Sequence, residues 1–99
     1  MNKNQIKHHT KVLPGIVRNE VYEYEDIKYT ERFDDVTGKR MFGMITMYNG
    51  VTVCHVHENG SIILEMPTNW VTNRKDVKDL VADIERLDEF LAAVCKNYK

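Results

Sequence analysis

The sequence predicts an α+β fold, in which an antiparallel meander of about four strands carries one long C-terminal helix on one face. Two Asn-Gly pairs, at residues 49–50 and 59–60, lie between runs of β-branched and apolar residues. Asn-Gly accepts the positive φ angles of two-residue turns. Strands near 40–48, 51–58 and 61–66 should therefore form two tight hairpins.

The C-terminal helix is predicted from the spacing of its apolar residues. Between Asn73 and Asn97 they recur three and four positions apart and form one stripe: Val77, Leu80, Val81, Ile84, Leu87, Leu91, Val94 and Cys95. Asn73 is the expected N-cap, and the charge of Asp76 suits the N-terminal end of a helix.

The N-terminal segment differs in charge from the segment that follows it. Residues 1–12 are polar and lack periodicity, so we expect a mobile basic arm there and a single domain over residues 13–99. Residues 1–19 hold no acid, whereas residues 20–35 hold seven acids and two basic residues. Such an arm either folds back onto the acidic strand or contacts phosphates.

The first strand is less well defined than the others. Pro14-Gly15 marks a turn, and residues 21–33 predict one bent strand with a bulge or break at Glu25-Asp26, where the alternation changes parity. Residues 34–38 predict a turn in which Gly38 is left-handed.

The length of that turn leaves the register of the first strand open. A four-residue loop would place Tyr29 beside Met44, and a three-residue loop would place it beside Ile45, on the opposite face.

Two-residue turns would sort the strand residues onto two faces, because side chains alternate along a strand. They would pair Met44 with His55 and His57 with Ile62, and this face is the expected seat of the helix. The opposite face carries Ile45, Met47, Val56 and Ile63. It is too apolar to face water, so we expect the N-terminal segment, a second copy or a partner to cover it.

Composition restricts the class of protein. The chain is 42% hydrophobic and 29% charged, which is ordinary for one soluble domain, and its net charge of −1 gives no global field for nucleic acid or an anionic membrane. No apolar run approaches the roughly 20 residues of a membrane helix, and the N-terminus has no secretory signal. Two cysteines, Cys54 and Cys95, suit a reducing compartment, so we expect a cytoplasmic protein.

No catalytic set assembles from the predicted strands. Ser61 would lie on the face away from His57, and Cys54 and His55 would point to opposite sides. His55 and His57 would point the same way as two metal ligands, but zinc needs a third ligand, and packed histidines are the ordinary alternative. We therefore expect a protein that is not an enzyme and holds no cofactor.

The sequence favours a small non-catalytic interaction protein, a bacterial or phage regulator or inhibitor that binds another protein or forms a homodimer. The expected interface combines the apolar second face with a loop tryptophan: Ile45, Met47, Val56, Ile63 and Trp70. The other role open to Trp70 is to close the end of the core.

The alternative function is a nucleic-acid-binding regulatory module. In this alternative, the basic arm contacts phosphates and tyrosines of the first strand stack on bases. The residues concerned are Lys3, Lys7, Lys11, Arg18, Tyr22 and Tyr24.

Overall fold

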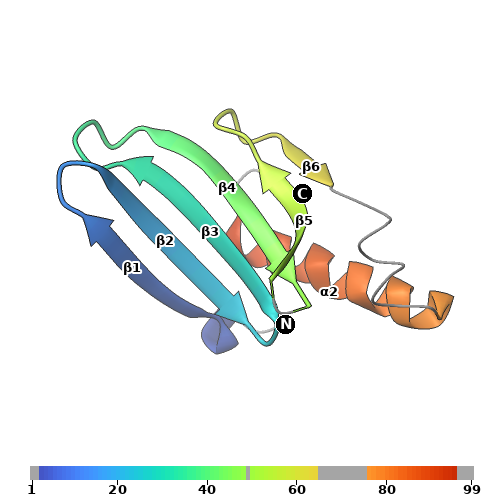
Figure 1. Cartoon of the computed structure of the whole chain (residues 1–99). Coiled ribbons are helices and arrows are strands. Elements are labelled where there is room, and N and C mark those ends of the chain that lie inside the picture. Colours follow the sequence, from blue (N-terminus) through green and yellow to red (C-terminus); the bar gives the residue numbers. More distant parts are fainter. Residues whose placement is uncertain (1–2, 49, 65–75, 96–99) are drawn as a thin grey trace.

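The computed structural model describes residues 3–48, 50–64 and 76–95. Within them, six antiparallel strands lie side by side in chain order in one sheet, and a helix crosses one face (Figure 1). The elements are η1 (Lys3–Gln5), β1 (Lys7–Leu13), β2 (Val17–Tyr24), β3 (Ile27–Asp34), β4 (Arg40–Met47), β5 (Val51–Val56), β6 (Ile62–Leu64) and α2 (Val77–Val94). The predicted α+β meander with a C-terminal helix is confirmed, and the sheet is wider than the four strands expected.

The two additional strands come from the N-terminal third of the chain. Residues 7–12, assigned from the sequence to the arm, form β1 together with Leu13, and this strand pairs with β2 from Lys7↔Glu23 to Leu13↔Val17. Every side chain of β1 is exposed, so this edge strand has no apolar alternation by which to predict it. The predicted turn at Pro14-Gly15 joins the two strands.

The prediction of one bent strand over residues 21–33 is wrong. Tyr24 pairs with Ile27, so Glu25-Asp26 forms the two-residue loop between β2 and β3, and Glu25 has a φ of 53°. The parity change in the sequence marked a reversal of the chain, not a bulge. Residues 34–38 form the predicted turn, with Gly38 at a φ of 74°.

Both Asn-Gly corners are wider than two residues. Met47 pairs with Val51 around the first corner, and a bulge in β5 then restores the predicted Met44↔His55 pair. At the second corner Val56, not His57, pairs with Ile62. This slip of one residue moves Ile63 to the face of His55, opposite to the prediction.

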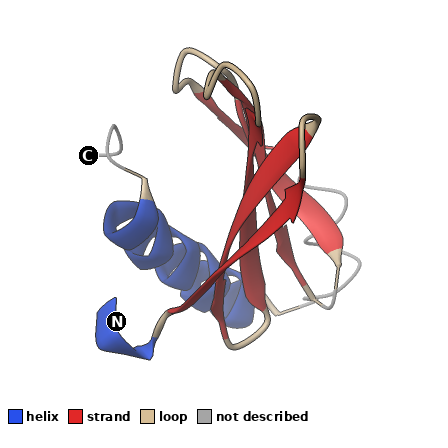
Figure 2. Cartoon of the chain, turned by 90° about the vertical axis from the view of Figure 1, so that its left-hand side faces the viewer, coloured by secondary structure: helices blue, strands red, loops and turns tan. Residues whose placement is uncertain are grey.

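The helix packs on the face that was predicted to need another cover. Leu87, Phe90 and Leu91 of α2 share a buried cluster with strand residues from that face: Ile27, Tyr29, Ile45, Met47, Cys54 and Val56. Figure 2 shows α2 against this side of the sheet. Tyr29 pairs with Ile45, so the register of β3 is the second of the two alternatives.

The helix begins later than predicted. Asp76 has an extended backbone and accepts a hydrogen bond from the Lys78 amide at 2.8 Å, so Asp76 is the N-cap in place of Asn73. Asn73 itself lies outside the described residues.

Candidate binding face of the sheet

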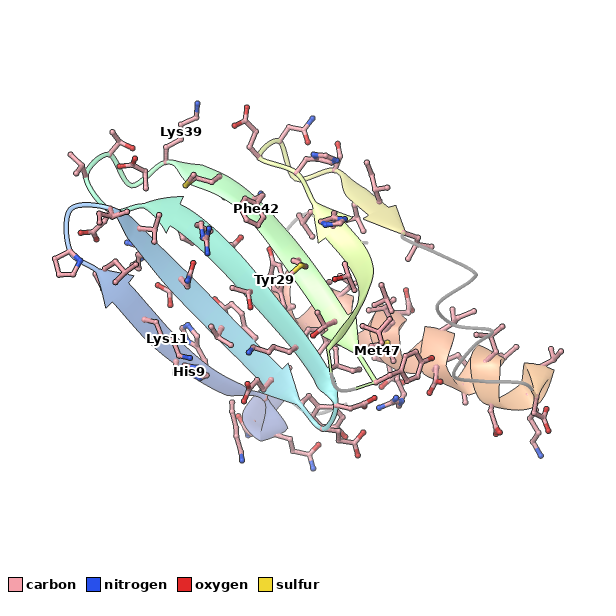
Figure 3. All side chains as sticks on the ribbon, in the orientation of Figure 1. His9, Lys11, Tyr29, Lys39, Phe42 and Met47 are labelled. Carbon is pink, nitrogen blue, oxygen red and sulfur yellow. The ribbon has the colours of Figure 1, made fainter. Side chains whose placement is uncertain are left out.

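The strand registers place one set of side chains on the side of the sheet away from α2, which we call the open face. Figure 3 looks onto it, and His9 and Lys11 project from β1. Its members occupy alternate positions of β1 to β6: Lys7, His9, Lys11, Asn19, Val21, Glu23, Lys28, Thr30, Arg32, Asp34, Phe42, Met44, Thr46, His55 and Ile63. The register aligns them in rows that cross the sheet.

The open face is positively charged. Its four basic residues, Lys7, Lys11, Lys28 and Arg32, outnumber its two acids, Glu23 and Asp34. Glu23 is the register partner of Lys7 and Lys28. Asp34, at the end of β3, instead accepts hydrogen bonds from the backbone amides of Val36 and Thr37, both at 2.9 Å. These hydrogen bonds lower the pKa of the Asp34 carboxyl.

The opposite charge is gathered on the helix. Among its residues, α2 carries more acids than bases: Asp79, Asp83, Glu85, Asp88 and Glu89 against Lys78 and Arg86. A chain with a net charge of −1 therefore has a basic sheet face and an acidic helix. Net charge alone had suggested no attraction to polyanions, because it averages over these two surfaces.

An aromatic ring and a guanidinium lie together near the middle of the open face. Arg32 and Phe42 are register partners, and the Arg32 Cζ atom lies 5.4 Å from the centroid of the Phe42 ring. The Arg32 Nε donates to the Asn19 Oδ1 at 3.1 Å, which orients the guanidinium. Phe42 remains 40% exposed, so part of its ring is open to a ligand.

A shallow hollow of about 420 Å³ borders this surface near the β2–β3 turn. It is lined by Lys28, Thr30, Met44 and Thr46, but also by Glu23, Glu25 and Asp26. The acids end the positive surface on this side, so a polyanion would lie toward Lys11, Arg32 and Phe42.

The helix side of the sheet holds a second cleft, of about 500 Å³, beyond the C-terminal end of α2. Several of its polar groups bind one another, although the buried Arg18 Nε has no hydrogen-bond partner among the described residues. Arg40 donates from Nε to Glu31 Oε2 at 2.6 Å and from Nη2 to the Tyr29 hydroxyl at 2.9 Å. Arg18 lies 4.5 Å above the Phe33 ring and forms an ion pair with Glu20 at 3.1 Å.

Three of the six residues predicted to bind nucleic acid lie on the helix side of the sheet: Arg18, Tyr22 and Tyr24. Tyr22 stacks between His8, at 4.3 Å, and Tyr29, at 5.9 Å, and Tyr24 packs against the core. Arg18 shares their face, whereas Lys7 and Lys11 lie on the open face. The structure therefore places these tyrosines and lysines on opposite faces of the sheet. The side chain of Lys3 lies outside the description.

The residues of the predicted protein interface do not share a surface. Ile45, Met47 and Val56 are at most 4% exposed, because α2 covers them. Ile63 is 48% exposed on the open face, and Trp70 lies outside the described residues. These three core residues cannot contact a partner while α2 is in place.

The candidate ligands and nucleophiles are separated as well. His55 lies on the open face, while His57 follows the end of β5, where its carbonyl accepts a hydrogen bond from Arg40. Within residues 3–48, 50–64 and 76–95, no three His, Cys, Asp or Glu side chains are grouped to hold a metal. Cys54 is fully buried, and burial raises the pKa of the Cys95 thiol to about 11.

The sequence reasoning missed Lys28, Arg32 and Phe42. A signal for the first two was present in the alternation of Lys28, Thr30 and Arg32, which places three polar residues on one side of a strand. The seven acids of residues 20–35 mask this signal in a count of local charge.

Comparisons with protein-family models, with curated proteins and with solved structures found no match for this chain. In the part of the chain that the structure describes, no helix is long and apolar enough to cross a membrane.

Proposed function

We propose that this chain is a small non-catalytic binding protein whose open face binds single-stranded nucleic acid. The observation that carries the proposal is the set of four basic residues that alternate along β1 and β3 on the face without a helix. Lysine and arginine contact phosphates, and the release of counterions makes such contacts favourable at moderate salt.

The exposed ring of Phe42 supports a single strand over a duplex. Unpaired bases can stack on aromatic side chains and on guanidinium planes, and base stacking on a sheet is a common mode of single-strand recognition. Phe42 and Arg32 offer both surfaces next to each other, flanked in the row by Asn19 and Lys11. A duplex keeps its bases stacked on one another and gains nothing from this ring.

The protein-binding regulator expected from the sequence remains the second candidate. The positive open face also suits an acidic protein surface, but contacts between proteins would leave Phe42 without a base to stack on. If the open face binds an acidic protein instead, the chain should bind no oligonucleotide. It should then capture an acidic protein, and added salt should weaken that capture.

The test is a titration of the full chain against a labelled single strand of about 16 nucleotides, followed by fluorescence anisotropy. Between about 50 and 200 mM salt, four phosphate contacts predict a slope of log K on log salt near −3, roughly −0.7 per contact. Lys11→Glu and Arg32→Glu should each weaken binding about tenfold and reduce the slope by about one. Phe42→Ala should weaken single-strand binding and leave the salt slope unchanged.

Lys39→Glu is the matched control, because it makes the same charge change in the exposed β3–β4 loop, away from the open face (Figure 3). It should bind as the wild type does. Equal losses for Lys39→Glu and Lys11→Glu would mean that only overall charge matters. Absence of binding at about 50 mM salt would end the nucleic-acid proposal.

A further inference from the structure

The N-terminal half of α2 carries an apolar stripe that neither the core nor the open face uses. Val77, Val81 and Ile84 are 73%, 47% and 44% exposed, although they recur one helical turn apart. The buried contacts of the helix come mainly from its C-terminal half, at Leu87, Phe90 and Leu91. Figure 1 shows the N-terminal half of α2 extending past the strands.

Two opposite charges flank this stripe on one side. Lys78 and Glu85 are both exposed and lie seven residues apart, so they project from the same side of the helix next to the stripe. Asp88 follows the stripe toward the C-terminus and limits the apolar surface to the first half of the helix. The stripe is thus short and has a basic end and an acidic end.

We propose that a second copy of the chain occupies this stripe, with the two α2 helices antiparallel about a twofold axis near Val81. In that arrangement Val81 meets its own copy, and Val77 meets Ile84. Residues on the same flank of an antiparallel helix pair face each other, so Lys78 lies opposite Glu85 on both sides of the axis. A parallel pair would place the same flank of the two helices on opposite sides of the seam, so Lys78 and Glu85 would not meet.

The size of the contact sets the expected affinity. Three apolar side chains from each copy bury less than the roughly 800 Å² per partner of a standard interface. The dimer should therefore be weak and dependent on concentration, with a dissociation constant of about 10 to 100 μM. The open face lies on the far side of the sheet from α2, so both copies keep it accessible. The dimer proposal stands independently of nucleic-acid binding.

Sedimentation equilibrium of the full chain over a concentration series tests the proposal. The wild type should approach twice the 11.6 kDa chain mass, and Val81→Asp should remain at the chain mass, because a charge would be buried at the twofold axis. Thermal unfolding of Val81→Asp separates loss of the dimer from loss of the fold. Val36→Asp makes a similar change at a residue that is 75% exposed in the β3–β4 turn, and it should dimerise normally.

Charge exchange tests the antiparallel direction. Lys78→Glu and Glu85→Lys should each weaken the dimer about tenfold, since each creates two like-charge contacts across the axis. The double variant restores opposite charges at both places and should recover the wild-type dissociation constant. A monomeric wild type at about 1 mM, or a folded Val81→Asp that still dimerises, would overturn the proposal. A double variant weaker than both single ones would overturn the antiparallel pairing.

Discussion

Gly43 is a glycine whose replacement the structure forbids for a steric reason. It lies on β4 opposite Glu31, and a Cβ atom there would come within 2.5 Å of Tyr29 Cε1 and 2.7 Å of the Tyr29 hydroxyl. Tyr29 is 1% exposed, so its ring has no free space into which it could move. Burial also raises the pKa of the Tyr29 hydroxyl, so the side chain stays neutral. The missing side chain at Gly43 therefore makes room for the most enclosed aromatic ring of the sheet.

We expect Gly43→Ala to lower the free energy of unfolding by about 1–3 kcal/mol, as overpacking a core does. Urea denaturation followed by circular dichroism measures the change. Thr46→Ala, on the same strand but on the open face, is the control and should alter stability by about 0.5 kcal/mol or less. If the two variants were equally stable, the contact between Gly43 and Tyr29 would not constrain the sheet.

The left-handed residues show where local sequence rules succeed and fail. Gly38 takes the predicted positive φ, because the DDVTG turn depends only on its own residues. Glu25 and Tyr48 also have positive φ angles, of 53° and 52°, without being glycine. Such residues are uncommon, so no local rule predicts a reversal at Glu25 or a first Asn-Gly corner that extends to Tyr48.

A cluster of charged and polar side chains joins α2 to two hairpins of the sheet. Arg86 donates from Nη1 to Asp26 at 2.9 Å and from Nη2 to Asp83 at 3.1 Å. The Tyr48 hydroxyl donates to the other oxygen of Asp83 at 2.7 Å, and the Tyr48 amide donates to Asp26 at 3.2 Å. Asp83 is 4% exposed, so its charge depends on these partners.

The pKa of Asp26 shows the balance within this cluster. Burial by itself would raise the pKa of Asp26, but the hydrogen bonds from Arg86 and from the Tyr48 amide bring it below its usual value. A carboxyl with a lowered pKa stabilises the folded state above its unfolded pKa, near 4, and this contribution is lost as the pH falls through the folded value.

Arg86→Met should therefore lower the free energy of unfolding by on the order of 3 kcal/mol at pH 7, because it leaves the buried Asp83 without its cation. The difference from the wild type should begin to shrink below about pH 4, where Asp26 of the unfolded chain becomes protonated, and should shrink further as the pH falls through the lowered pKa of Asp26 in the folded wild type. Urea unfolding at a series of pH values measures both effects. Lys39→Met, at an exposed loop residue, should show neither.

The order of the elements after residue 34 could be predicted, but the N-terminal strands and the faces of the sheet could not. The helix, the turn at residues 34–38 and the strands after it follow from local periodicity and turn residues. The face of each strand depends on loop length, and one residue of slip moved Ile63 across the sheet. The candidate site depends on which residues share a face of the sheet. Lys28 and Arg32 could therefore be assigned to the same surface as Lys11 only from the observed register.

The buried cluster between α2 and the sheet lies on one side of the sheet, and the open face contributes the buried Val21, which is 3% exposed. The buried cluster combines α2 with one face, whereas the open face keeps basic residues and one partly exposed phenylalanine. A domain of about this size has limited apolar surface to bury, so placing most of it under one helix leaves the other face available for binding. Phe90 lies in the cluster on the helix side of the sheet and Phe42 lies on the open face, so substitutions at these two residues compare the two sides.

We expect Phe90→Ala to lower the free energy of unfolding by about 3–5 kcal/mol, because Phe90 is 0% exposed at the centre of the cluster between α2 and the sheet. Phe42→Ala removes the same side chain from the open face, where the ring is 40% exposed, and should cost about 1 kcal/mol. Urea denaturation of the two variants measures both values. Equal losses would mean that the open face is buried against something as firmly as the helix side, and the single-sided core would have to be abandoned together with the binding face.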